Sequence, residues 1–424
     1  MKILIKEVTL VKPGSSDSGS VHDVLIVDGI IQKIAAPGSL SLNDGEIIPA
    51  KNKYLSAGWF DLHVNFREPG HEYKEDLISG CKAAAQGGFT GVLCMPSTSP
   101  PIHTKSEVEF VLNKTKHELV EVHVAGTLSH QREGKDLSEM YDMSTAGAIA
   151  FTDDKRAVQD AGLMTRALLY AKNFGGRIFS FADDYSLSVK GQMNEGITST
   201  TLGLKGIPSI AEEVMISRDL QLTAYTESSI HFSTVTTKAA TNLIREAKQR
   251  GLNVSADVSA LHLAMDDSEL SDFNTLLKVK PPLRTSDDIE ALIEGLNDGT
   301  ISAICSDHSP EDPENKVKEF DLASFGASGL ETAFGAACKA IGKKVSLDVL
   351  IDKFSNGPRR VLGLSEIKIE EGAKANLTLF DPNLEWTVDD TKFKSKSMNN
   401  PFTGKELKGK AVAVINRDQL QICS

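Results

Sequence analysis

The chain has 424 residues, which is long enough for one large domain and a small accessory domain. Of these residues 40% are hydrophobic and 25% charged, a composition typical of a globular protein. A formal net charge of −12 argues against nucleic acid and anionic membrane surfaces as partners. No run of about 18 apolar residues is present, so we expect no membrane span. The five cysteines are scattered without a CxxC pair, which predicts free thiols in a reducing cytoplasm.

Both ends of the chain have the pattern of β-strands. Residues 1–55 alternate apolar and polar side chains, and the Asp28-Gly29 pair between two apolar runs predicts a hairpin. From about residue 366 the chain returns to strands, with clear runs at 376–382 and 411–416. We therefore predict a small β-sandwich domain built from residues 1–55 and 366–424.

Between these ends, residues 56–365 alternate short apolar runs with helical stretches, which is typical of βα units. After a first strand near residue 60, the runs expected to form strands lie at 90–96, 120–124, 149–151, 178–181, 229–232, 254–258 and 301–305. About eight such units predict a (β/α)₈ barrel. An open doubly wound sheet is the alternative, but no G-x-G-x-x-G motif opens a helix.

In a barrel, functional side chains follow the strands. Residues 58–70, GWFDLHVNFREPG, begin as a buried strand and end in a polar turn, and residues two apart on a strand share a face. His63, Asn65 and Arg67 should therefore point the same way. The other polar residues that follow expected strands are Ser97, Asp153, Asp154, Asp183, Asp184, His231, His262, Lys280, Asp307 and His308.

These residues carry a resemblance to the dihydroorotases of the amidohydrolase superfamily. Residues 58–70 resemble the family's first signature, Asp-x-His-x-His-x-Arg-Glu-Pro-Gly, with Asn65 in place of the second histidine. Further matches are GGFTGVLCMPST (87–98), FTDD (151–154), MNEG (193–196), KVKPPLR (278–284), SDHSP (306–310), GLET (329–332) and NNPF (399–402). The FTDD segment is similar to the bacterial type I branch of the family.

The resemblance implies one or two zinc ions held by four histidines and two aspartates. It assigns His63 and His231 as metal ligands, together with Asp153 or Asp154, between which spacing does not choose. Asp307 stands where the family has both a metal ligand and the catalytic acid/base.

Two other ligand positions have lost their histidines, because Asn65 and Phe181 stand there. Zinc prefers nitrogen, sulfur and carboxylate ligands, so we expect one weakly held zinc ion at most, or none.

The resemblance also implies which residues would bind substrate. Arg67 is kept in this chain, whereas Ser97 and Lys280 stand where the family has asparagines. An arginine at this position clamps a substrate carboxylate. The charge of Lys280 would either repel a metal dication or take over part of its electrostatic role.

Three functions follow from this pattern of retained scaffold and altered site. The first is a non-catalytic dihydroorotase-like protein of pyrimidine synthesis that serves as a partner of aspartate transcarbamoylase. The second is an active dihydroorotase, converting dihydroorotate and N-carbamoyl-aspartate with one zinc ion. The third is a hydrolase of another cyclic amide, such as a hydantoin-like ring. The resemblance also implies a homodimer.

Overall fold

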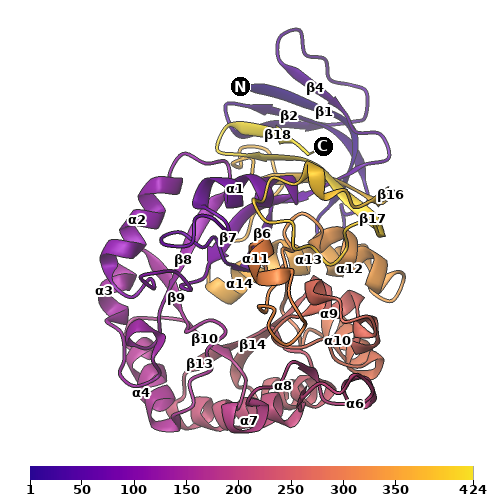
Figure 1. Cartoon of the computed structure of the whole chain (residues 1–424). Coiled ribbons are helices and arrows are strands. Elements are labelled where there is room, and N and C mark those ends of the chain that lie inside the picture. Colours follow the sequence, from indigo (N-terminus) through magenta and orange to yellow (C-terminus); the bar gives the residue numbers. More distant parts are fainter. Residues whose placement is uncertain (424) are drawn as a thin grey trace.

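The structure is a computed structural model that describes residues 1–423. Within these residues a parallel sheet of eight strands curls into a barrel, as the sequence pattern predicts, with helices around its outside (Figure 1). Its strands are β6 (Trp59–Val64), β7 (Phe89–Cys94), β8 (Glu121–Gly126), β9 (Ala148–Phe151), β10 (Ile178–Phe181), β13 (Ser229–Ser233), β14 (Asn253–Ser259) and β15 (Ala303–Cys305).

The last strand returns to the first through the segment that follows it. A parallel bridge joins Val64 to His308. The N–H of Asn65 donates to the carbonyl of His308 at 2.8 Å, and the N–H of His308 donates to the carbonyl of His63 at 3.2 Å. The barrel is therefore closed at the point where two of the candidate site segments meet.

The outer layer consists of helices between successive strands (Figure 1). The longer ones are α1 (Leu77–Gln86), α2 (Lys105–Thr115), α3 (Met140–Thr145), α4 (Ala161–Lys172), α7 (Ile210–Thr226), α8 (Lys238–Gln249), α10 (Ser286–Asp298), α12 (Ala333–Ile341), α13 (Leu347–Phe354) and α14 (Asn356–Leu362). Shorter elements lie in the connections: α5 (Tyr185–Ser188), β11 (Met193–Asn194), α6 (Ile197–Leu202), β12 (Gly206–Ile207), α9 (Ala260–Ala264) and α11 (Pro313–Lys316). None of the helices in residues 1–423 is long and apolar enough to cross a membrane.

Helix α8 shows how local sequence sets these elements. The Thr237 hydroxyl caps its start by accepting from the N–H of Ala240 at 3.1 Å. Its buried residues, Ala240, Thr241, Ile244 and Ala247, recur at the spacing that places side chains on one helix face. That face packs on the barrel.

Both ends of the chain meet in a small β domain at one end of the barrel, as predicted (Figure 1). Eight strands of residues 1–423 join there in one mixed sheet, and buried side chains from both chain ends form a hydrophobic core of their own. They are β1 (Lys2–Val11), β2 (Val21–Val27), β3 (Ile30–Ala35), β4 (Glu46–Pro49), β5 (Tyr54–Ala57), β16 (Leu377–Thr387), β17 (Glu406–Asn416) and β18 (Gln419–Ile422). Strand β5 from the N-terminal end pairs antiparallel with β16 from the C-terminal end.

Trp59 joins this sheet to the barrel. Its side chain is fully buried, with ring centroids 4.3 Å from Phe334 and 5.4 Å from Phe380. Phe334 lies on α12 and Phe380 on β16, so one side chain contacts the barrel layer and the small sheet together.

We expect Trp59→Ala to lower the free energy of unfolding by about 3–5 kcal/mol, because it leaves a cavity between the two domains. Chemical denaturation followed by circular dichroism measures the change. Tyr225→Ala removes an aromatic ring that is 79% exposed and serves as the control, with an expected change within about 0.5 kcal/mol.

Glu331 fastens the C-terminal segment to the barrel. Its carboxylate accepts from the N–H of Lys394 at 2.8 Å and from the N–H of Ser395 at 3.0 Å. Burial raises the pKa of Glu331 to about 7, and the negative charge of Glu75 adds to the effect.

Because the pKa of Glu331 in the folded state lies above its ordinary value, the folded chain binds more protons than the unfolded chain between about pH 4.5 and pH 7. The contribution of Glu331 to the free energy of unfolding therefore falls as the pH rises through that window. Glu331→Gln keeps an acceptor oxygen but cannot titrate. When the pH is raised from 5 to 8, we expect its Tm to fall less than the Tm of the parent chain. An equal loss in both proteins would contradict the assignment.

Candidate active site

A cavity of about 590 Å³ opens at the carboxyl ends of the barrel strands. Six of the residues singled out in the sequence line it: Asn65, Arg67, Ser97, Asp154, Lys280 and Asp307. Lys155, Arg132 and Glu311, which the sequence analysis passed over, line it as well.

His63 lies at the end of β6 and is almost completely buried. Its Nε2 atom is 2.8 Å from Oδ1 of Asp154 and 3.5 Å from Oδ1 of Asp307. A carboxylate only accepts hydrogen bonds, so Nε2 carries the proton and donates to Asp154. Ser97 donates its hydroxyl to the other oxygen of Asp154.

The two aspartates between which the sequence could not choose point in different directions. Asp153 accepts from the N–H groups of Leu128 at 3.0 Å and Ser129 at 2.9 Å, and so holds the preceding loop. Asp154 faces the cavity. Burial alone would raise the pKa of Asp154, but His63 and neighbouring cations outweigh it and lower that pKa far below its ordinary value.

Lys155 places its ammonium beside the carboxylate of Asp307. Its Nζ is 2.8 Å from Oδ1 of Asp307. Burial would lower the pKa of Lys155, but Asp307 and Asp154 outweigh it and raise that pKa. The amine is therefore charged throughout the physiological pH range.

Two further side chains surround this ammonium. The ring centroid of Phe181, at the end of β10, is 5.1 Å from Nζ of Lys155, a cation–π contact. The hydroxyl of Thr234, which follows β13, is 3.4 Å from the same atom. Neither side chain offers a ligand that zinc prefers.

His231, expected to be a metal ligand, is not part of this group. It lies in the middle of β13, three residues before Thr234, and points into the barrel beneath the site. Its Nε2 is 2.9 Å from Oδ2 of Asp257, and its Nδ1 is 2.8 Å from the hydroxyl of Ser255. It also lines a separate cavity with residues at the amino ends of the strands, such as Ser229. The strand end, where a ligand would be needed, carries Thr234 instead.

Arg67, the expected carboxylate clamp, is already paired within the chain. Its Nη2 is 3.0 Å from Glu311, and its Nε donates to the carbonyl of Pro310 at 3.1 Å. Lys74 contacts the other oxygen of Glu311 at 2.6 Å. A buried carboxylate of the protein thus occupies the position that a substrate anion would need.

Lys280 also lines the cavity but has other partners. Its Nζ is 2.6 Å from Oδ2 of Asp183 and 5.2 Å from the ring centroid of Tyr185. The sequence analysis expected Lys280 to place a positive charge next to the metal pocket. In the structure, Lys155 supplies the charge at that position.

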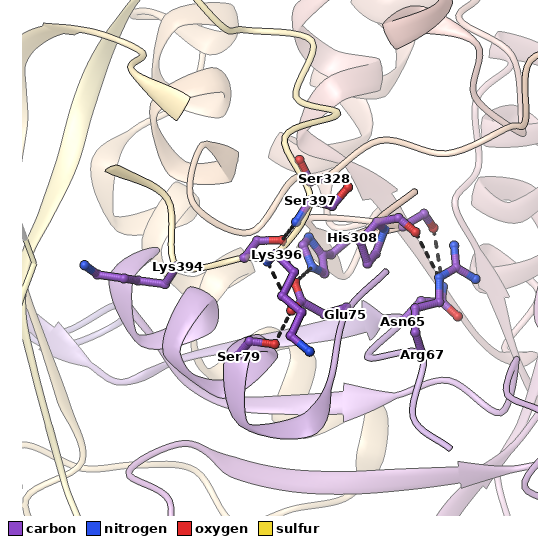
Figure 2. Close-up of polar contacts among 12 residues, drawn as sticks. Asn65, Arg67, Glu75, Ser79, His308, Ser328, Lys394, Lys396 and Ser397 are labelled. Carbon is purple, nitrogen blue, oxygen red and sulfur yellow. Dashed lines mark hydrogen bonds and ion pairs between the residues drawn. The ribbon is translucent and has the colours of Figure 1, made fainter. Parts of the chain in front are cut away.

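Asn65 and His308 fix the loop that carries Asp307. The Asn65 amide donates to the hydroxyl of Ser309 at 3.4 Å. Nδ1 of His308 accepts from the N–H of Gly329 at 3.2 Å, so Nε2 carries the proton and faces Glu75 at 3.5 Å. Figure 2 shows Glu75 between His308 and Ser79, with the Asn65 and Arg67 segment alongside.

The residues present do not fit a zinc ion. In residues 1–423 no three His, Cys, Asp or Glu side chains are arranged to hold a metal. Nε2 of His63, the nitrogen closest to both aspartates, is engaged in a hydrogen bond with Asp154. His71 lines the cavity, but its ring packs against Tyr73, and the ring of His130 packs against His103.

Only part of this site carries a sequence signal. Lys155 directly follows Asp154, so a search of strand ends extended by one residue would have found it. Thr234 and Glu311 carry no such signal, because the first depends on where β13 ends and the second on how the loop after β15 folds back.

Comparisons with known proteins agree with this fold. The dihydro-orotase-like family model matches residues 52–240. The dihydroorotase of Acetivibrio thermocellus is 42% identical over 410 residues, covering 96% of each chain. The dihydroorotase of Pelotomaculum thermopropionicum is 44% identical over 421 residues, covering 98% of this chain and 97% of its own.

Solved structures show the same architecture at lower sequence similarity. The L-hydantoinase from Arthrobacter aurescens superimposes with a TM-score of 0.84 at 23% identity, covering 99% of this chain and 95% of its own. A D-hydantoinase gives a TM-score of 0.84 at 24% identity, covering 100% of this chain and 95% of its own. These likenesses establish the barrel with its appended sheet. Together with identities above 40% to dihydroorotases over almost the whole sequence, they show that the chain belongs to the dihydroorotase family.

Proposed function

We propose that this chain is a dihydroorotase-family protein that does not hydrolyse dihydroorotate, binds no zinc, and acts in cytoplasmic pyrimidine synthesis as a non-catalytic partner of aspartate transcarbamoylase. The observation that carries the proposal is the set of contacts at the strand ends. His63, Asp154 and Asp307 are engaged with one another and with Lys155, and no set of open metal ligands remains among residues 1–423.

Hydrolysis of a cyclic amide near neutral pH needs a strong nucleophile and a polarised carbonyl. A metal ion supplies both, by lowering the pKa of bound water to about 7 and by acting as a Lewis acid. Asp307 could still accept a proton, but its Oδ1 already lies 2.8 Å from an ammonium. That oxygen is engaged in an ion pair, so the retained aspartate does not replace the lost nucleophile.

Substrate binding is opposed as well. A carboxylate that enters the cavity must displace Glu311 from both Arg67 and Lys74. Glu311 is buried and belongs to the same chain as these two cations. Its effective concentration next to them is therefore high compared with that of a free substrate. This supports a protein that has no need to bind the family's substrate.

The retained scaffold supports a role that depends on shape. The barrel, its closure at His308 and the sheet from both chain ends are all intact, while the changes gather in one cavity. A protein kept for assembly needs its surface and stability and can lose its ligands. Assembly with aspartate transcarbamoylase, with the chain itself a homodimer, fits that requirement.

We expect no hydrolysis of dihydroorotate by the purified chain after incubation with zinc, measured as loss of ultraviolet absorbance. The chain with Asp307→Ala gives the background from contaminating host enzyme, and the dihydroorotase of Acetivibrio thermocellus is the positive control. Turnover that Asp307→Ala abolishes would contradict the proposal.

We expect the chain to co-elute with aspartate transcarbamoylase from its own organism in size-exclusion chromatography with light scattering. The expected result is a peak heavier than either protein alone and a transcarbamoylase that is more stable to heat in the mixture. Separate elution at micromolar concentration, with unchanged transcarbamoylase stability, would exclude this partner while leaving the lack of hydrolysis untouched.

A further inference from the structure

We infer that Lys155 is a built-in cation: its ammonium pairs with Asp307 and supplies the positive charge that a metal ion would otherwise bring to the cluster of His63, Asp154 and Asp307. The inference rests on the proposed function in one respect, since it requires that the natural chain holds no zinc at this site. It goes further by naming the group that replaces the metal and by predicting what its removal does.

The position of the ammonium is the first argument. Nζ of Lys155 is 2.8 Å from Asp307, and Asp307 is 3.5 Å from Nε2 of His63. Nε2 is in turn 2.8 Å from Asp154. One nitrogen and two carboxylates thus converge on a region that a cation must neutralise, and the side chain of Lys155 reaches it.

The charge of the cluster is the second argument. Asp154 is 4% exposed, and the side chain of Asp307 is 11% exposed. Two carboxylates at such depth are costly unless positive charge accompanies them. Lys155 supplies one such charge, and Arg132, 4.0 Å from Asp154, supplies the other. These two positive charges offset the two carboxylates without any ion from solvent.

The surroundings of Lys155 are the third argument. The Phe181 ring lies 5.1 Å from its Nζ, and an aromatic face favours an ammonium but cannot coordinate a metal. Thr234 adds a hydroxyl at 3.4 Å that accepts from the same amine. Both side chains suit a lysine and would be poor zinc ligands, so these two neighbouring positions favour the same replacement.

The other cations that line the cavity have different partners. Lys280 pairs with Asp183, while Arg67 and Lys74 pair with Glu311. Removal of Lys155 therefore leaves Asp307 without a cationic partner of its own, and also leaves a space of lysine size beside three potential ligands.

The test compares the natural chain with three variants at the site and one control variant. Thermal unfolding is measured for each protein with and without excess zinc chloride. Lys155→Met removes the charge and keeps most of the volume, whereas Lys155→Ala also opens space for an ion. Lys155→Ala combined with Asp307→Asn removes a ligand from that space. Lys135→Ala, at a lysine whose side chain is 74% exposed, is the matched control.

We expect the natural chain and Lys135→Ala to have the same Tm, unchanged by zinc or by a chelator. Lys155→Met and Lys155→Ala should each lose about 5 °C, because a buried carboxylate loses its partner. Zinc should restore most of that loss in Lys155→Ala but not in Lys155→Met or in the double variant. Metal analysis should find zinc in Lys155→Ala alone.

Three outcomes would overturn the inference: stoichiometric zinc in the natural chain, a Lys155→Met variant as stable as its parent, or a Lys155→Ala variant that zinc does not stabilise. The last two leave the proposed function standing, because it depends on the absence of turnover and of zinc in the natural chain. Dihydroorotate turnover by the natural chain would instead remove the proposed function, and the variants would still report whether Lys155 carries the charge.

Discussion

Closure of the barrel through the backbone of His308 is the constraint on which the site depends. Its N–H and carbonyl bond to the backbones of His63 and Asn65, so the end of β6 and the segment after β15 are held in one register. The neighbouring Asp307 is thereby placed beside His63. Glu75, buried on the other side, holds the His308 ring and so fixes this loop from behind. Any function of the cavity is built on a frame that needs no ligand to form.

Within that frame the chain satisfies its buried charges internally. Lys155 and Arg132 balance Asp154 and Asp307, and Arg67 shares Glu311 with Lys74. In an enzyme that hydrolyses amides, some of these charges would wait for a metal or a substrate. Here each of them already has a partner on the same chain, which explains how the fold tolerates a polar cavity of about 590 Å³ at its centre. The intact scaffold and the internally paired charges are two aspects of one self-contained charge arrangement.

Much of this architecture was accessible from sequence, because strand and helix periodicities and the Asp28-Gly29 turn are local signals. The site was accessible only in part. His63 could be found because it lies at the end of a clear strand, whereas His231 lies two residues before the end of β13 and contacts Asp257 and Ser255 instead of the cavity residues. Asp153 and Asp154 could be separated only by tertiary contacts, since each follows the same strand. The pairing of Arg67 with Glu311 joins residues 244 apart, and no local pattern reports such a contact.

The pairing of β5 with β16 has a consequence for biosynthesis. The two strands are separated by the entire barrel sequence, yet they are neighbours in one sheet. During translation β5 leaves the ribosome first, and its edge stays unpaired until β16 has been made. The complete sheet, with β16 to β18 added to the N-terminal strands, therefore forms only after almost all of the chain has been synthesised. The aromatic side chains under it, among them Trp59, stay uncovered until then. Folding of the nascent chain is for this reason a late event, and the exposed edge of β5 is the place where a chaperone would be needed most.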